Sequence, residues 1–266
     1  MARLLEALEG GIDLVRRGRR MLGRPGRRDL APRAEAGQKG WPDQSTATRP
    51  RPEDQAIDFG DLRRMKPVSR VWGFDRGLPI DRHYIERFLA ARSAAIRGRV
   101  LEIGEPLYTD MFGGGRVTQS EILDVTANPN ATYSCPLEEG DDLPDESFDC
   151  VVLTQTLQYI YDLRGALVTL HRILKPGGTV LCTVPGITRI SQEEYKDAWY
   201  WSFTGASATC LFSEVFSRDA LGVEAFGNIL AATGFLYGLA ASELTSGELD
   251  HFDPNYEVII GVAAMK

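Results

Sequence analysis

Acidic residues and a glycine lie at the ends of two strand-like apolar runs. The run over residues 99–103 contains Glu102 and is followed by Gly104 and Glu105, and the next run ends at Glu121. A carboxylate can accept hydrogen bonds from two hydroxyl groups at once, and a glycine lets the backbone approach a ligand closely. In open α/β sheets, ligands bind beyond the carboxyl ends of the strands. The pattern therefore predicts a small-molecule site at these strand ends.

Strand-like and helix-like segments alternate through most of the chain. Residues 79–95 predict an amphipathic helix that leads directly into the first strand. Such alternation is typical of a parallel sheet with helices on both faces. We therefore expect an α/β fold with a mostly parallel seven-stranded sheet. The expected strands cover residues 99–103, 116–121, 131–134, 150–153, 179–184, 235–240 and 256–264.

The N-terminal part of the chain differs in composition from the rest. Residues 1–22 place leucines at helical spacing beside a cluster of arginines, which predicts a basic amphipathic helix. Residues 24–54 are rich in Pro, Gly, Ser, Thr, Gln and charge, as linkers are. We expect a helix and linker over residues 1–56 and one domain over residues 57–266. The basic helix could contact an anionic membrane or a protein partner, and a solvated tail is the alternative.

Charge and cysteine usage exclude several classes of protein. The net charge is −7, and the basic residues concentrate near the N-terminus, so the expected domain over residues 57–266 is strongly acidic. An acidic domain is unsuited to binding nucleic acid, which needs clustered Lys and Arg. The four cysteines show no CxxC spacing, and the N-terminus lacks the order of a signal peptide, which favours the cytoplasm. Three scattered histidines predict no metal site.

Three segments resemble the core of class I S-adenosylmethionine-dependent methyltransferases. They are RVLEIG at 99–104, FDCVVLTQTLQYIYD at 148–162 and HRILKPGGTVLCTVPG at 171–186. Further stretches of residues 57–266, such as YWSFT and GNILAATGFLYGLAASEL, look like a bacterial, glycosyltransferase-associated subgroup of the type 11 methyltransferase domains. The resemblance implies a Rossmann-like fold, S-adenosylmethionine as cofactor, and a glycan or other small-molecule acceptor.

The resemblance also implies roles for the acids of the first two strand ends. Gly104 would permit close approach of the cofactor to the backbone, and Glu102 would help to position the methionine ammonium group. Glu105 could also face the ammonium group if binding survives the altered turn. Glu121 would accept both ribose hydroxyls, with Asp124 as the competitor if the strand register differs.

Four further residues take cofactor roles under the resemblance. Asp142 and Leu143 would contact the adenine, the first at its amino group and the second at its ring. Thr154 and Gln155 would lie where the cofactor sulfur and the acceptor meet.

The turn after Gly104 departs from the family pattern. Where relatives continue with two more glycines, this chain has Glu105 and Pro106. Proline has no N–H to donate and fixes φ, so the turn cannot be the usual glycine loop. A catalytically degenerate binding or scaffold protein is therefore the alternative to an active enzyme.

Methyl transfer to a hydroxyl requires alignment of the acceptor and removal of its proton. Asp197 is the first candidate base and His251 the second, because each lies in a non-strand segment beyond a strand end. The aromatic segment that follows the fifth strand suits stacking on a sugar or a flat ring. We expect a methyltransferase acting on an oxygen of a saccharide or secondary metabolite. The expected acceptor residues are Gln158, Trp199, Tyr200 and Trp201.

Overall fold

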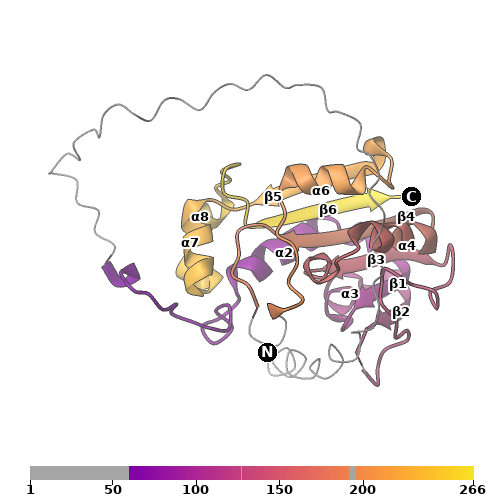
Figure 1. Cartoon of the computed structure of the whole chain (residues 1–266), viewed down its shortest axis with the longest axis horizontal. Helices are drawn as coiled ribbons and strands as arrows, with labels where there is room; N and C mark the ends of the chain where they lie inside the picture. The colour runs from indigo at the N-terminus through magenta and orange to yellow at the C-terminus, as the bar shows by residue number, and fades with distance from the viewer. Residues whose placement is uncertain (1–59, 127, 192–195) are drawn as a thin grey trace, which may run out of the picture. The chain divides into compact units, whose positions relative to one another are not determined.

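The computed structural model describes residues 60–126, 128–191 and 196–266, in which six strands form one sheet of order β2-β1-β3-β4-β6-β5 (Figure 1). Neighbours among the first four strands run parallel, and β6 runs antiparallel to both β4 and β5. The expected α/β fold class is confirmed. The strands are β1 (Gly98–Ile103), β2 (Val117–Leu123), β3 (Phe148–Thr154), β4 (Leu174–Pro185), β5 (Leu221–Phe226) and β6 (Ile259–Met265).

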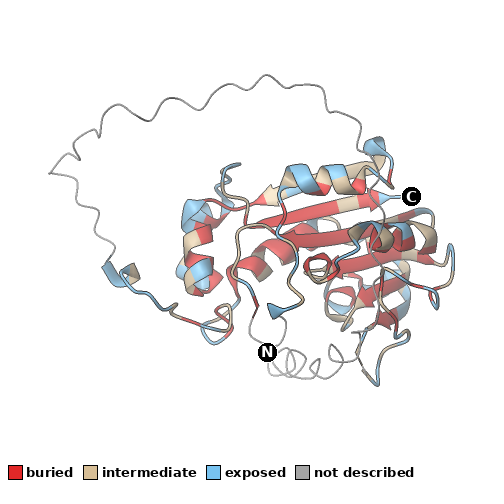
Figure 2. Ribbon diagram, in the orientation of Figure 1, coloured by how far each residue is buried: buried red, intermediate tan, exposed pale blue. Residues whose placement is uncertain are grey.

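Helices cover both faces of the sheet. Successive side chains of a strand point to opposite faces, so neighbouring apolar residues pack against different helices. In β3, Val151 packs in the cluster that includes α4 (Leu163–Ile173) and α6 (Gly205–Phe212). Its neighbour Val152 packs with α2 (Ile80–Ala91) and α7 (Ile229–Tyr237). Figure 2 shows the strands as a buried layer between these helices. The other helices of the described ranges are α3 (Leu107–Phe112), α8 (Ser246–Asp250), η1 (Gly60–Leu62), η2 (Ser93–Ala95), η3 (Gly114–Arg116), η4 (Leu157–Tyr159), η5 (Arg218–Ala220) and η6 (Ala241–Glu243).

Helix α2 begins at the sheet edge where β1 ends. Its apolar residues Ile80, Tyr84 and Phe88 recur at helical spacing and are fully buried, which fixes α2 along the sheet. Only η2 separates the end of α2 from the start of β1, so the helix runs opposite to that strand. The Arg82 guanidinium accordingly donates to the hydroxyl of Tyr108, in the first turn after β1, at 3.1 Å. The first turn of α2 therefore belongs to the carboxyl edge.

The number of strands differs from the expected seven. Among the described residues, the segment expected as a third strand pairs with β2 only through an isolated bridge between Tyr133 and Leu123, and it forms no ladder. The strand expected over residues 235–240 is wrong. Phe235 belongs to α7, because Asn228 caps that helix by accepting hydrogen bonds from the amides at its start. Strand β5, which the sequence analysis did not find, takes the outer position of the sheet.

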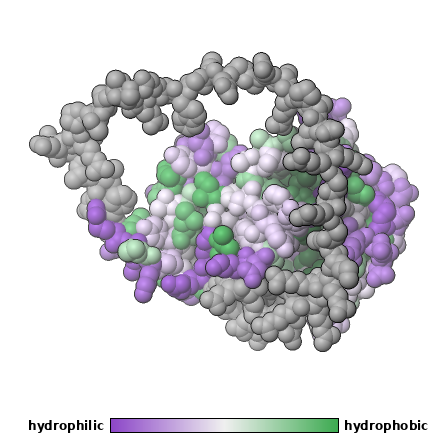
Figure 3. Space-filling model, in the orientation of Figure 1, coloured by the Kyte–Doolittle hydropathy of each residue, from purple (hydrophilic) through white to green (hydrophobic). Residues whose placement is uncertain are grey.

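The expected helix and linker over residues 1–56 lie outside the described residues. Residues Lys66–Lys266 belong to one structural unit, and Arg17–Met65 form a second unit of which only residues 60–65 are described. In the described ranges, no helix combines the length and the apolar character needed to cross a membrane. Hydrophilic residues gather on the surface at the side where β1 and β2 lie (Figure 3).

Candidate functional site

The turn after β1 is built around the buried carboxylate of Glu102. Its two oxygens accept hydrogen bonds from the amides of Tyr108, at 3.0 Å, and Thr109, at 2.7 Å. These amides belong to the first turn of α3, where the helix itself provides no acceptor. Burial raises the pKa of Glu102 to about 7, although the two hydrogen bonds act in the opposite direction. Pro106 directly precedes α3, so its missing N–H leaves the helix intact.

Gly104 has the conformation and the open surroundings of a ligand-binding glycine. Its φ is +82°, a value that favours glycine, and a Cβ atom built there would meet no atom within 4 Å. The Gly104 amide donates to the carbonyl of Leu123 at 2.9 Å, which joins the end of β1 to the end of β2. Glu105 follows and is exposed. A ligand can therefore approach the backbone closely at this point.

Asp124, the first residue after β2, lies beside this turn. Its Oδ1 atom accepts from the amide and the hydroxyl of Thr126, at 2.8 and 2.7 Å. The Nδ2 atom of Asn128 lies 3.0 Å from Asp124 Oδ2 and 3.0 Å from the Gly104 carbonyl. Asn128 thus connects the two turns, and Asp124 is held at the carboxyl edge of the sheet.

Glu121 does not lie at the end of its strand, as the sequence analysis expected. Strand β2 continues to Leu123, so Glu121 lies within it. The Arg99 guanidinium donates from Nε to Glu121 Oε2 at 3.0 Å and from Nη2 to Oε1 at 3.1 Å. Arg99 also donates to the hydroxyl of Tyr133 at 2.9 Å. The Glu121 carboxylate is buried and bound within the protein.

The end of β3 provides polar atoms at the centre of the carboxyl edge. Thr154 ends the strand, and Gln155 follows with a φ of 48°, uncommon for a residue other than glycine. The Gln155 amide donates to the carbonyl of Thr183 on β4 at 2.9 Å. Gln158 is buried and donates from Nε2 to the Gln155 carbonyl at 2.8 Å. Its Oε1 atom is buried and has no partner within the described part of the chain.

The described residues between the end of β4 and Phe203 lie in two limbs, 186–191 and 196–202, which we call the β4 loop. The Phe203 amide donates to the Pro185 carbonyl at 2.8 Å, so the loop leaves and rejoins the sheet at the same place. Because β4 is parallel to β3, this place lies at the carboxyl edge.

The β4 loop brings the four expected acceptor residues together. The Gln158 carbonyl accepts from the amides of Tyr200, at 2.8 Å, and Trp201, at 3.3 Å. The ring of Trp199 packs edge-on against Tyr159 at a centroid distance of 5.2 Å. These contacts join the second limb of the loop to η4, directly after β3.

Of four other expected site residues, three are exposed and one is buried in the core. Asp197 is exposed on the β4 loop, and Asp142 is exposed in the segment before β3. Leu143 packs in the core with α4, which leaves no surface for an adenine ring. His251 is exposed after α8, and its carbonyl accepts from Asn228, which follows the outer strand β5. His251 therefore lies beside the segment that follows the outer strand, and its expected role as a base stays a prediction.

Sequence analysis missed two charged residues in the first turn of α2. The Arg82 side chain donates to Tyr108, and its Nε atom is buried with no partner among the residues described. Asp81 is also buried, which raises the pKa of its carboxyl group. The sequence signal for these two residues is a charged pair, Asp81 and Arg82, at the start of a helix whose buried face is otherwise apolar. A buried guanidinium with a free N–H suits an anionic ligand group.

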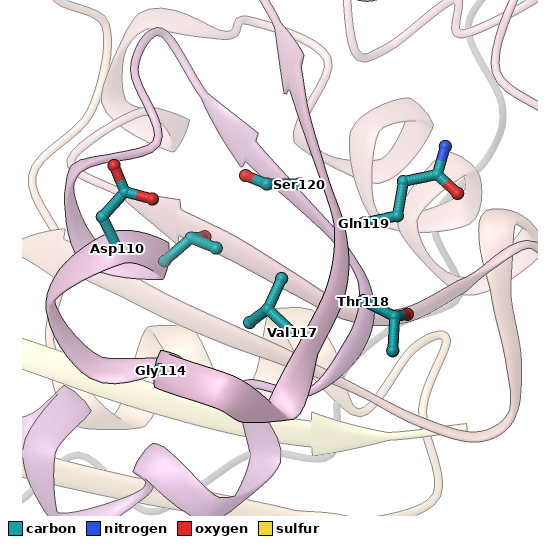
Figure 4. A pocket seen from close by; sticks show the side chains of 7 residues that line it. Asp110, Gly114, Val117, Thr118, Gln119 and Ser120 are labelled. Carbon is teal, nitrogen blue, oxygen red and sulfur yellow. The ribbon is translucent and has the colours of Figure 1, made fainter.

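A cavity of about 330 Å³ lies between α3 and the edge strand β2 (Figure 4). It contains none of the expected site residues, and its polar lining comes from both elements. We assign it no role. The lining residues are Thr109, Asp110, Gly114, Val117, Thr118, Gln119 and Ser120.

A family model described as "Methyltransferase domain" matches residues 81–235, more than half of the chain. No curated protein matches. Similar solved structures include an S-adenosylmethionine-dependent methyltransferase from Archaeoglobus fulgidus, with 13% identity over 69% of this chain and 94% of that chain and a TM-score of 0.48. A second, an S-adenosylmethionine-dependent methyltransferase from Mesorhizobium loti, has 18% identity over 73% of this chain and 100% of that chain and a TM-score of 0.47. The 1,6-didemethyltoxoflavin-N1-methyltransferase of Burkholderia thailandensis has 14% identity, 69% and 76% coverage and a TM-score of 0.45.

Proposed function

Because the protein belongs to the methyltransferase domain family, we propose that it methylates an oxygen of a saccharide or related secondary metabolite. The class I S-adenosylmethionine-dependent methyltransferase recognised in the sequence is confirmed by the family match, and S-adenosylmethionine is its cofactor. The oxygen and the class of acceptor are the proposal. The observation that carries the site is the open glycine turn at Gly104, between the buried Glu102 and the start of α3.

The residues around this turn fit the cofactor. Gly104 leaves open space at the backbone, as close approach of a ligand requires. One buried polar atom at this edge, Arg82 Nε, has no partner in the described ranges. Buried polar atoms usually have a partner, so this atom is suited to a bound molecule.

We assign the cofactor contacts residue by residue. Asp124 replaces Glu121 as the acceptor of the ribose hydroxyls, because it lies at the strand end and is not bound to an arginine. Arg82 binds the methionine carboxylate through charge-assisted hydrogen bonds. Glu105, which is exposed beside Gly104, remains our candidate for the ammonium group. The cofactor supplies an electrophilic methyl group on a sulfonium.

The acceptor is placed by the end of β3 and the β4 loop. Gln158 offers its buried Oε1 atom as a hydrogen-bond acceptor, and it also holds the backbone of Tyr200 and Trp201. Tyr200 is exposed, and its ring packs edge-on against Tyr161 at a centroid distance of 5.4 Å, so part of it can stack on a sugar. Asp197, on the same loop, is our candidate for removing the hydroxyl proton. These contributions align the acceptor rather than bond to it covalently.

Calorimetric titration with S-adenosylhomocysteine tests the cofactor site first. A ligand that binds only the native state must also raise the melting temperature, so a thermal shift is the independent check. We expect micromolar binding. Absence of binding at millimolar ligand would reject an active enzyme and favour a degenerate binding protein.

A transfer assay then tests the acceptor. Isotope-labelled methyl groups from S-adenosylmethionine are followed into a panel of sugar glycosides and phenolic metabolites, and the products are analysed by mass spectrometry. We expect a methyl ether. Labelling of an amine or a carbon, with hydroxyl-only compounds unlabelled, would contradict the proposed reaction while leaving the cofactor site intact.

A further inference from the structure

Arg189, on the first limb of the β4 loop, carries two nitrogen atoms without a hydrogen-bond partner. Its Nε and Nη2 atoms are shielded from solvent, and no residue of the described chain accepts a hydrogen bond from either. Leaving a charged donor buried and unpaired is unfavourable. A partner that is not part of the described chain is therefore expected at these two atoms.

Nε and Nη2 form one edge of the guanidinium group, and this protein uses that edge elsewhere to bind carboxylates. Arg99 donates from Nε and Nη2 to the two oxygens of Glu121, at 3.0 and 3.1 Å. Arg76 binds Glu243 through the same two atoms. Two parallel N–H bonds match the two oxygens of a carboxylate. The unpartnered edge of Arg189 therefore fits a carboxylate.

Trp72 holds the Arg189 guanidinium in place. The guanidinium carbon lies 3.8 Å from the centre of the Trp72 ring, close enough for a cation–π interaction. Trp72 has a φ of 57°, an outlier for a bulky residue. The buried hydroxyl of Ser69 fixes this turn by accepting from the amides of Val71 and Gly73, both at 3.1 Å. Strained backbone of this kind clusters at ligand sites.

A second arginine, Arg70, acts on Arg189. The pKa of Arg189 is lowered, first by burial and then by the positive charge of Arg70. Like charges disfavour each other, and a bound anion would reduce this cost.

We propose that Arg189 binds a carboxylate of the methyl acceptor, so that the acceptor is an acid such as a uronic acid sugar. This inference rests on the proposed function, in which the β4 loop binds the acceptor. Arg189 lies four residues after β4 ends, and Tyr200 lies on the other limb of the same loop. One limb would bind the carboxylate and the other would contact the ring.

The test follows the Nε–H NMR signals of arginines in the full chain during titration with glucuronate. The Arg189 signal is identified by its loss in Arg189→Lys. We expect glucuronate to shift this signal and glucose to leave it unchanged. Lysine keeps the charge but lacks the planar fork, so Arg189→Lys should weaken glucuronate binding by about tenfold or more. The matched control Arg164→Lys, at an exposed position of α4, should bind as the original protein does.

Four outcomes would overturn the inference. The first is an Arg189 signal that responds to neither glucuronate nor acetate. The second is normal binding of glucuronate by Arg189→Lys. A response to glucose 6-phosphate but not to glucuronate would assign a phosphate instead. The double variant Glu193→Gln with Glu194→Gln removes the nearest carboxylates in the sequence. A shift of the Arg189 signal in that variant without ligand would show that the chain itself supplies the carboxylate.

Binding of S-adenosylhomocysteine separates this inference from the proposed function. Normal binding of that ligand without any response to carboxylates rejects the acidic acceptor and leaves the methyltransferase in place. Loss of both responses rejects the proposed function as well.

Discussion

Arg99 and Glu121 form a two-point ion pair inside the sheet, with Nε–Oε2 and Nη2–Oε1 distances of 3.0 and 3.1 Å. The pair joins β1 to β2 and lies before the carboxyl ends of both strands. Glu121 is therefore a structural acid, whereas Asp124 follows the end of β2 and is our proposed acceptor of the ribose hydroxyls. The two acids lie three residues apart. Substitution of Asp124 should lower cofactor affinity, whereas substitution of Glu121 should lower stability.

Asp124→Asn should weaken S-adenosylhomocysteine binding by about tenfold or more, since a carboxylate accepts two hydroxyls better than an amide. Glu121→Gln should leave affinity nearly unchanged but lower the free energy of unfolding by about 1–3 kcal/mol, because it weakens a buried hydrogen-bonded pair. Calorimetry and urea unfolding measure the two effects. A loss of S-adenosylhomocysteine affinity in Glu121→Gln as large as that in Asp124→Asn would contradict a purely structural role of Glu121.

Gly104→Ala should abolish tight cofactor binding. A Cβ there would point into the open space beside the turn, and the positive φ makes alanine less stable by about 1–2 kcal/mol. Gly114→Ala is the matched control, because Gly114 has a φ of +55° and equally open surroundings but lies after α3. Both variants should lose similar stability in urea unfolding, and only Gly104→Ala should lose affinity for S-adenosylhomocysteine. Similar affinities in the two would exclude Gly104 from the site.

Arg82→Met should weaken binding of S-adenosylhomocysteine but not of methylthioadenosine, which lacks the amino acid part. The expected loss is about tenfold, because one charge-assisted contact is removed. Tyr108→Phe, which removes the hydroxyl that Arg82 binds, should cause a smaller loss of the same kind. Calorimetry with both ligands makes the comparison. Parallel losses for the two ligands would mean that Arg82 acts on folding and not on the carboxylate.

Glu102 should make the protein less stable as the pH rises. Its pKa is about 7 in the folded protein, above the ordinary 4.5, because burial disfavours the charged form. Between these values the folded state holds a proton that the unfolded chain has lost. The stabilisation is full below about pH 4.5 and is lost as the pH rises through 7, by about 3 kcal/mol in total.

Urea unfolding at pH 5 and pH 8 measures this loss. Glu102→Gln cannot titrate, so its stability should change less between the two pH values than that of the original protein. Glu139→Gln, at an exposed position, is the control and should behave as the original protein does. An unchanged pH dependence in Glu102→Gln would assign the effect to other groups.

The sequence predicted the elements whose patterns are strong. The helix over residues 79–95 and the strands over 99–103 and 150–153 recur closely in the structure, because periodic apolar residues determine burial. Residues 235–240 were misjudged because the continuous apolar run there suits either a strand or a helix. The cap at Asn228 decides for a helix. Strand β5 is short and half exposed, which leaves little periodic signal.

The site was harder to predict, because contacts between distant residues depend on register. The sequence predicts a strand that ends at Glu121, although the apolar Ile122 and Leu123 continue it, so we propose Asp124 instead of Glu121 for the ribose. Gln158, Tyr200 and Trp201 are predicted from their types, and the structure joins them through the Gln158 carbonyl. Their contact with the acceptor stays a prediction. Arg189 gave no signal in sequence, since only its missing partners distinguish it from a surface arginine.

The hydrogen bond between the Phe203 amide and the Pro185 carbonyl brings the two ends of the β4 loop together at the sheet. A segment whose two ends meet can gain, lose or exchange residues at a small entropic cost, which grows only slowly with length. The two limbs of the β4 loop could therefore change in length or sequence while the sheet and the turn after β1 stay as they are. Under the proposed function, replacing these limbs would be the way to redesign acceptor preference.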